Sequence, residues 1–296
     1  MDIGHNIADG YKYTATTARI YADVPLQALG LGLSDFTIDL RHPWPIIISL
    51  GSFVAYISLI AGWRLVWPPK PENRGRHDLG FTHHVLLCLY SLFACSAALY
   101  YLFSSGEIFN FNAYMCTPVP AWLRLVSLTF TVSKIWEWRD TTIMLDRGDS
   151  LVKIGFLHLY HHCTTFVLFL LIVNTPSTEK SGLFFNGFVH TLMYAHYAWR
   201  LPKPFRPVIT AAQIVQLAVA TWMWHISPAT CPAFASFPAA DPIAFIGPYA
   251  LVPVYLAFFL QFFVTTYILA PSKPAGGAIK TRSGGGGGRG AAKKEE

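Results

Sequence analysis

Charged residues are scarce in this sequence. Only 13% of the 296 residues are Asp, Glu, Lys or Arg, which is about half of the roughly 25% found in soluble domains. This scarcity, together with 53% hydrophobic residues, excludes a disordered or fibrous chain and an ordinary soluble enzyme. The composition indicates an all-α polytopic membrane protein.

Cysteine is also infrequent, and the five cysteines lack the paired spacing of zinc sites or disulfide scaffolds. The first 40 residues lack a basic start followed by an apolar core, so we expect no cleavable signal peptide. The net charge is +6, but the basic residues lie in short connections and a tail. This distribution argues against nucleic acid as a partner.

Long apolar segments are present, and seven of them could cross a bilayer as helices, since an apolar core about 30 Å thick needs roughly 20 residues. The predicted spans are residues 45–67, 83–103, 120–139, 151–173, 182–199, 208–226 and 243–270. We therefore expect an N-terminal segment 1–44, a seven-helix membrane domain 45–270 and a flexible basic tail 271–296.

Lys and Arg concentrate in the connections after the first, third and fifth spans and in the tail. The opposite connections, 104–119, 174–181 and 227–242, contain only Lys180. This alternation predicts a cytosolic C-terminus and an N-terminus on the far side. Lys293 and Lys294, four and three positions from the end, resemble the dilysine retrieval signal of endoplasmic reticulum membrane proteins; a solubilising charged end is the alternative.

Polar side chains inside the spans form stripes at helical spacing. His158, His161 and His162 lie within about 100° of arc on the fourth span. Three imidazoles on one face of an apolar helix favour catalysis over a metal site or a structural hydrogen-bond cluster, because each ring needs a polar partner away from water. The other stripes contain Lys134, Glu137 and Asp140 on the third span, Asn186, His190, Tyr194 and Tyr197 on the fifth, and Thr210, Gln213 and Gln216 on the sixth.

In the predicted orientation these stripes lie in the cytosolic half or near the middle of the membrane, whereas residues 166–173 beyond them are wholly apolar. The sequence thus predicts a histidine-lined polar cavity with an apolar blind end, which suits an amphiphile with a polar head and an acyl tail. Basic residues flank its mouth and could hold phosphates, although the positive-inside bias alone would also place them there. They are Arg147, Lys153, Arg200, Lys203 and Arg206.

Four motifs, in order and spacing, resemble those of the ELO family of fatty acid elongases. They are Lys-x-x-Glu-x-x-Asp-Thr at 134–141, His-x-x-His-His at 158–162, Asn-x-x-x-His-x-x-Met-Tyr-x-Tyr-Tyr at 186–197 and Thr-x-x-Gln-x-x-Gln at 210–216. One departure is clear, because His196 stands where the third motif has the first Tyr of its terminal pair.

The resemblance implies a very-long-chain 3-oxoacyl-CoA synthase of the endoplasmic reticulum membrane, with six of seven helices around an acyl-chain tunnel. Such an enzyme condenses a long-chain acyl-CoA with malonyl-CoA and releases CO₂ and CoA. The resemblance implies no cofactor, and acyl-CoA and malonyl-CoA are the two expected substrates. Reductases and a dehydratase would complete the elongation cycle as partners, and a homodimer is left open.

We expect the imidazole of His161 to be the nucleophile and to form an acyl-imidazole, since Cys163 points about 100° away from His162. His190 would assist malonyl decarboxylation, while His158 and His162 orient and stabilise. The expected substrate-binding residues are Lys134, Glu137, Asp140, Asn186, Tyr194, Tyr197, Gln213, Gln216, Arg200 and Lys203. Cys116 and Cys231 fall in far-side connections and could pair in an oxidising lumen, or stay as thiols.

Three rival interpretations stay open. A di-iron desaturase or hydroxylase needs about eight histidines in several boxes, whereas this chain has 11 histidines but one box. Two more, His190 and His196, belong to the third motif, and six are scattered at His5, His42, His77, His83, His84 and His225. A seven-helix receptor or retinal protein is disfavoured by a last span without Lys, and a transporter by the lack of a paired set of Gly/Pro-broken spans.

Overall fold

The computed structural model describes residues 31–32, 37–38, 43–74, 76, 78–173, 176–231 and 242–269. The predicted tail, with Lys293 and Lys294, lies outside these residues, as does most of the N-terminal segment. Within the described residues the chain is helical, apart from two antiparallel strands of two residues each, β1 (Leu31–Gly32) and β2 (Thr37–Ile38).

Every predicted span falls on helical structure. The long helices are α1 (Pro43–Val66), α2 (Phe81–Ser104), α10 (Phe205–Thr230) and α13 (Pro242–Phe263), the last continuing as the π-helical turn η6 (Val264–Ile268). In the described part of the chain, four helices are long and apolar enough to cross a membrane, namely Pro45–Val66, Phe81–Ser104, Phe205–Thr230 and Gly247–Ile268. The chain therefore has the helices of a membrane protein.

The third and fourth predicted spans are each interrupted in the structure. The third consists of α4 (Ala121–Trp136) and α5 (Trp138–Asp146), and Glu137 lies at the junction. The fourth consists of α6 (Leu151–Ile154) and the apolar α7 (Phe156–Ile172). Gly155 separates them with φ +87°, a backbone conformation that glycine adopts without steric cost.

The fifth predicted span begins with a π-helical turn, η5 (Gly182–Asn186), and continues as α9 (Gly187–Trp199). Such turns place one extra residue in a helix and occur often at functional sites. The remaining short helices are η3 (Pro71–Asn73), η4 (Glu107–Phe109), α3 (Phe111–Cys116) and α8 (Pro176–Ser181).

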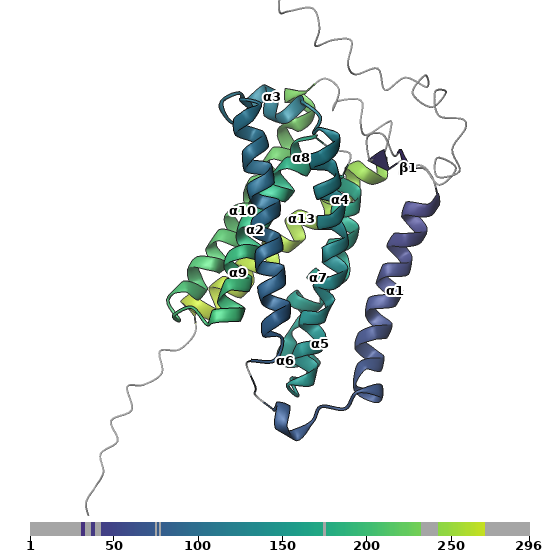
Figure 1. The fold of residues 1–296 in the computed structure, drawn as a ribbon, viewed down its shortest axis with the longest axis vertical. Coiled ribbons are helices and arrows are strands. Elements are labelled where there is room, and N and C mark those ends of the chain that lie inside the picture. Colours follow the sequence, from purple (N-terminus) through teal and green to yellow (C-terminus); the bar gives the residue numbers. More distant parts are fainter. Residues whose placement is uncertain are drawn as a thin grey trace, which may run out of the picture.

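Helices α2, α4, α7, α9, α10 and α13 form the bundle, and α1 lies at its edge (Figure 1), where it contacts α5 and α7. The most extensive packing joins α2 to α9. Their close approach depends on Gly187, because a Cβ atom there would lie 3.0 Å from the backbone oxygen of Ser91. In the hydrophobic core of the bundle, Phe130 of α4 packs edge-on against Phe169 of α7.

Candidate active site

The four sequence motifs meet around one open cavity of about 1250 Å³, lined by side chains of α5, α7, α9, α10 and α13. Most of the predicted site residues line it: Glu137, Asp140, His158, His161, His162, Asn186, His190, Tyr197, Arg200, Lys203, Gln213 and Gln216. Lys134 and Tyr194 stand behind this lining, where both are fully buried. Their contacts with the lining residues make them supports for its geometry rather than parts of its surface.

The histidines of α7 are held by residues of neighbouring helices. His158 Nε2 lies 2.9 Å from the hydroxyl of Thr141, which also hydrogen-bonds Tyr56 at 3.0 Å. The His158 and His162 rings lie close together, with centroids 4.2 Å apart and planes tilted by 30°. Trp138 Nε1 donates to the His162 backbone carbonyl at 3.0 Å, which anchors α7 to α5.

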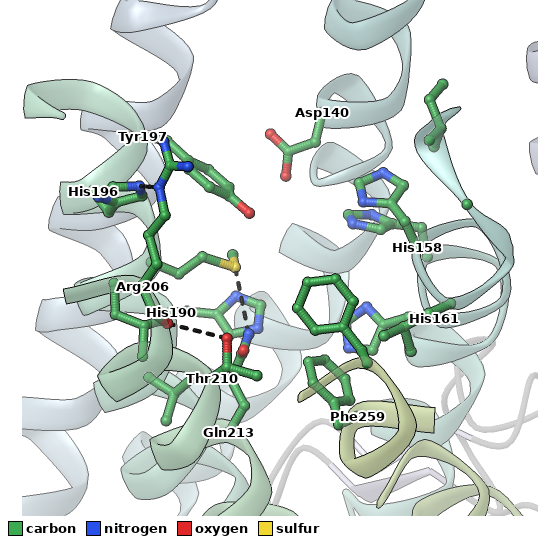
Figure 2. A pocket seen from close by; sticks show the side chains of 18 of the residues that line it. Asp140, His158, His161, His190, His196, Tyr197, Arg206, Thr210, Gln213 and Phe259 are labelled. Carbon is green, nitrogen blue, oxygen red and sulfur yellow. Dashed lines mark hydrogen bonds between the residues drawn. The ribbon is translucent and has the colours of Figure 1, made fainter. Parts of the chain in front are cut away.

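His161 points into the cavity from the same helix (Figure 2), and its ring lies edge-on to that of His162, with centroids 5.5 Å apart. Its ring packs against Tyr255 and Phe259 of α13, with centroids 5.3 Å and 6.2 Å away. These aromatic contacts cover one side of the imidazole, whereas its other side lines the cavity.

A buried ion pair organises the side of the cavity that carries His190. Lys134 Nζ donates to Glu137 Oε1 at 2.7 Å and to Asn186 Oδ1 at 2.9 Å. His190 Nδ1 lies 3.3 Å from the same Glu137 oxygen. The ammonium also sits over the Phe130 ring, 4.2 Å from its centroid, where the ring face attracts a cation. The Lys134–Glu137 pair therefore contacts Asn186 of η5 through Lys134 and His190 of α9 through Glu137.

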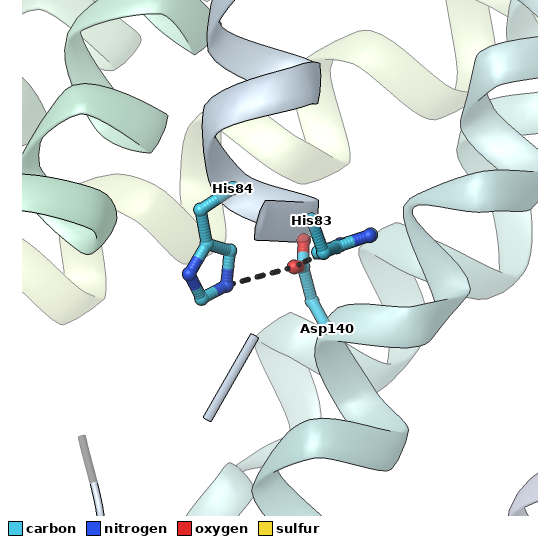
Figure 3. A group of neighbouring side chains, drawn as sticks. All are labelled: His83, His84 and Asp140. Carbon is cyan, nitrogen blue, oxygen red and sulfur yellow. Dashed lines mark hydrogen bonds and ion pairs between the residues drawn. The ribbon is translucent and has the colours of Figure 1, made fainter. Parts of the chain in front are cut away.

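Asp140 is the centre of a second polar group (Figure 3). His83 Nε2 lies 2.9 Å and His84 Nε2 3.5 Å from Asp140 Oδ1. The hydroxyl of Tyr194 donates to Asp140 Oδ2 at 2.8 Å. The expectation that His83 and His84 are scattered is thus wrong, because the first turn of α2 brings both onto the carboxylate. Two adjacent imidazoles at the start of an apolar span were the available signal.

The ligand atoms of His83, His84 and Asp140 lie within 4.8 Å of one another, so we tested the group as a metal site. Histidines that bind metals nearly always donate their second N–H to a carboxylate or carbonyl. Among the described residues, the Nδ1 atoms of His83 and His84 are buried without a hydrogen-bond partner. The arrangement therefore favours a carboxylate held by hydrogen bonds over a metal centre.

A narrow second cavity of about 80 Å³ continues from the first. Among the described residues, His161, Asn186, Gln216 and Leu217 line both cavities. Its wall includes Leu168, Phe169 and Ile172 of the apolar stretch 166–173, and its far end is lined by Thr178, Ser181, Met223 and Trp224. His161 thus lies where the larger cavity, which holds the histidines and the basic residues, meets the smaller and more apolar one.

A sequence model of the GNS1/SUR4 (ELO) family matches residues 40–275. The chain belongs to this family. Among similar proteins, fatty acid elongase 6 of Leishmania major is 34% identical over 165 residues, covering 55% of this chain and 42% of the relative. Very long chain fatty acid elongase 4 of Homo sapiens is 27% identical over 279 residues, covering 87% of this chain and 81% of the relative. The chain therefore spans less than half of the first relative but most of the second.

In this ELO-family chain, the cysteine beside the histidine box does not line either cavity. Cys163 is half-buried and packs with Tyr56 and Trp138 on the α1 side of α7. This placement agrees with the direction expected from the helical spacing. The side chain is therefore directed away from the histidines that line the cavity.

Cys116 and Cys231 lie next to each other in the structure. Burial, with the neighbouring Cys231 thiol as the second cause, raises the pKa of Cys116 to about 12. The Cys116 thiol also lies 3.8 Å from the Thr230 carbonyl oxygen. Both residues are thiols here, so the proximity that a disulfide needs is present and the bond itself stays a prediction.

The wide end of the larger cavity is basic, since Arg147, Lys153, Arg200, Lys203 and Arg206 all line it. Lys153 is paired with Asp149, and Arg147 donates to the Leu79 carbonyl. The connection from α9 to α10 contributes Arg200 and Lys203, and Arg206 follows in the first turn of α10. In the described part of the chain, none of these three cations forms a salt bridge with a carboxylate, although the charge of Arg200 acts on Asp78 from a greater distance.

Proposed function

We propose that this chain is a fatty acid elongase of the endoplasmic reticulum membrane. It condenses a long-chain acyl-CoA with malonyl-CoA to a 3-oxoacyl-CoA two carbons longer and releases CO₂ and CoA. The observation that carries the proposal is the place of His161, at the junction of a wide basic cavity and a narrow apolar one. The names of the similar proteins support the same reaction class.

The proposed architecture has seven spans, six of which surround the acyl-chain tunnel. The four long apolar helices support four of these spans. The other three would be α4 with α5, α7 with α6, and α9 with η5, whose polar side chains line the cavity and lower their hydropathy. In the proposed orientation the basic end of the cavity faces the cytosol, where CoA esters are available, and the narrow end points to the lumen.

In the first half-reaction, an imidazole nitrogen of His161 attacks the acyl-CoA carbonyl carbon. The carbon–sulfur bond breaks, and the CoA thiolate takes up the proton that the acylated ring releases, which yields CoA and an acyl-imidazole. The side-chain amides of Asn186 and Gln213 line the cavity and would stabilise the oxyanion. The acyl tail extends along Leu168, Phe169 and the narrow cavity.

In the second half-reaction, malonyl-CoA occupies the wide cavity and loses CO₂. The resulting enolate carbon bonds to the acyl carbon, the carbon–nitrogen bond to His161 breaks, and the released imidazole takes one proton from water, which is the proton that the overall reaction consumes. His190, positioned beside Glu137 at 3.3 Å, would bind the developing enolate oxygen. His158 and His162 hold the box in place through Thr141 and Trp138. The product keeps its 3-oxo group, so reductases and a dehydratase would act as partners.

The direct test is incubation of the purified chain with labelled malonyl-CoA and a panel of acyl-CoAs of different lengths. We expect labelled 3-oxoacyl-CoA products two carbons longer than the substrate, with one CO₂ released per product. Activity that persists after treatment with a strong chelator would separate this reaction from that of a di-iron oxygenase. Failure to form a labelled product with every acyl-CoA would overturn the proposal.

A further inference from the structure

His196 is the residue at which the third motif departs from the family pattern, and it lies at the wide end of the cavity. It occupies the last turn of α9, and its ring lines the cavity together with Arg200, Lys203 and Arg206. The side chain is partly buried, whereas Arg206 on the facing end of α10 is exposed. The two residues therefore meet at the rim, away from the histidines that carry the proposed chemistry.

One hydrogen bond joins these side chains across the two helices. Arg206 Nε donates to His196 Nε2 at 3.3 Å, as Figure 2 shows. Because Nε2 accepts this bond, the ring proton belongs on Nδ1. Among the described residues, this buried Nδ1 atom has no hydrogen-bond partner, and the backbone of Leu201 lies near the ring. The neutral imidazole thus accepts a hydrogen bond from Nε of Arg206 and holds the guanidinium group in place.

The guanidinium keeps its two outer nitrogens for another partner. In the described residues, no carboxylate forms an ion pair with Arg206, and its charge acts on two cavity-lining side chains, His196 and Tyr197. Two parallel N–H donors on a planar cation match the oxygens of a phosphate. A long arginine side chain loses rotamer freedom when it binds, and prior fixation at Nε reduces that loss.

We propose that His196 is a positioning residue that holds Arg206 at the cavity mouth so that the outer guanidinium nitrogens bind a phosphate of the CoA moiety. The inference rests on the proposed function, because it takes the CoA ester to enter by the basic end. His196 touches neither the thioester nor the acyl chain in this arrangement. Its effect passes through Arg206 and concerns substrate binding rather than the chemical step.

The test compares binding of CoA and of 3′-dephospho-CoA to the purified wild type and to His196→Ala, His196→Gln and Arg206→Gln. Binding is measured by calorimetry in neutral detergent without anionic lipid, so a lipid phosphate cannot replace the ligand. We expect His196→Ala to weaken CoA binding about fivefold to tenfold, as the loss of one charge-assisted hydrogen bond predicts. Glutamine can accept from Arg206 Nε, so His196→Gln should recover most of the affinity.

The double variant His196→Ala/Arg206→Gln should bind CoA no more weakly than Arg206→Gln alone. In turnover, His196→Ala should raise the KM for malonyl-CoA by the same factor while kcat changes less than twofold. If the His196→Ala effect disappears with dephospho-CoA, the phosphate is the 3′ group; an equal effect with both ligands assigns the diphosphate.

Unchanged CoA binding by a folded His196→Ala variant would overturn the inference. A double variant whose loss of CoA affinity equals the product of the two single-variant losses would also overturn it. A lowered kcat with an unchanged KM would also overturn it, because His196 would then act on the chemistry. These results leave elongation by the wild type intact. A wild type that neither binds CoA nor elongates any acyl-CoA would instead overturn the proposed function.

Discussion

The Lys134 ammonium lies 2.7 Å from Oε1 of Glu137, and both side chains are almost completely removed from solvent, at 0% and 2% exposure. A buried pair that loses one partner leaves an uncompensated charge, which costs about 3–5 kcal/mol. We therefore expect Lys134→Met to lower the unfolding temperature strongly and to abolish elongation. Thermal unfolding of the detergent-solubilised protein, followed by tryptophan fluorescence, measures the change.

Two variants serve as controls for this pair. Lys134→Met/Glu137→Gln removes both charges and should recover part of the lost stability. Lys153→Met removes an ion pair whose lysine side chain is 73% exposed, and should change the free energy of unfolding by less than about 1 kcal/mol. Equal unfolding temperatures for Lys134→Met and Lys153→Met would contradict the proposal that the buried pair contributes more to stability than the exposed one.

The nucleophile can be identified by intact mass spectrometry. Wild type incubated with acyl-CoA alone should gain the mass of one acyl group, because the second substrate is absent and the acyl-imidazole cannot be consumed. His161→Ala should gain no mass and should lose at least about 10³-fold in kcat, the scale for removal of a nucleophile. Cys163→Ala should be acylated like the wild type. An adduct that survives in His161→Ala and disappears in Cys163→Ala would make the cysteine the nucleophile.

The far end of the narrow cavity should limit the length of the acyl chain. Trp224 lines this end and is buried, whereas its neighbour Trp222 is 54% exposed on the outside of α10. Trp224→Leu shortens the obstacle and should shift the preferred acyl-CoA by about two carbons. Since each buried CH₂ contributes about 0.8 kcal/mol, the relative kcat/KM for the longer chain should rise roughly tenfold.

Competition between acyl-CoAs of neighbouring lengths measures this shift, and Trp222→Leu is the matched control. The control should keep the wild-type product distribution. Identical product distributions for both tryptophan variants would show that another part of the cavity limits chain length.

Glu179 of α8 predicts a dependence of stability on pH. Its carboxyl is buried at the end of the molecule opposite the basic mouth, 3.4 Å from Arg124 Nε. Burial raises the pKa of Glu179 to about 8, although Arg124 and Lys180 oppose the shift. A carboxyl whose pKa is raised in the folded state stabilises the fold fully below its unfolded pKa of about 4.3. That contribution is lost as the pH rises toward 8.

Between pH 6 and pH 9 the wild type should therefore lose roughly 5 °C in unfolding temperature. The Glu179→Gln side chain cannot ionise, so its unfolding temperature should change less with pH. The unfolding temperature of this variant should exceed that of the wild type most at high pH. The difference between the two profiles isolates Glu179 from other titrating groups, including Lys180. Parallel profiles for the two proteins would show that the Glu179 carboxyl does not change its ionisation over this range.

Much of the site was predictable because helical periodicity is a local property. The spacing of His158, His161 and His162 predicts that they reach one side of the fourth span, and all three line the cavity. The pairing of Lys134 with Glu137 is also local, since three residues of helix separate them. By contrast, the spacing did not reveal that Lys134 lies behind the cavity wall, because this depends on how α4 turns against Phe130 and Phe169.

The sequence by itself determined that the chain is helical and apolar, that its polar residues form stripes, and that His161 differs in direction from Cys163. These properties follow from composition and from the helical repeat, which act over a few residues. Only the tertiary structure decided that His83 and His84 of α2 meet Asp140 of α5, and that His196 of α9 meets Arg206 of α10. Contacts between helices depend on packing angles and close approach, as at Gly187, and no local pattern specifies them.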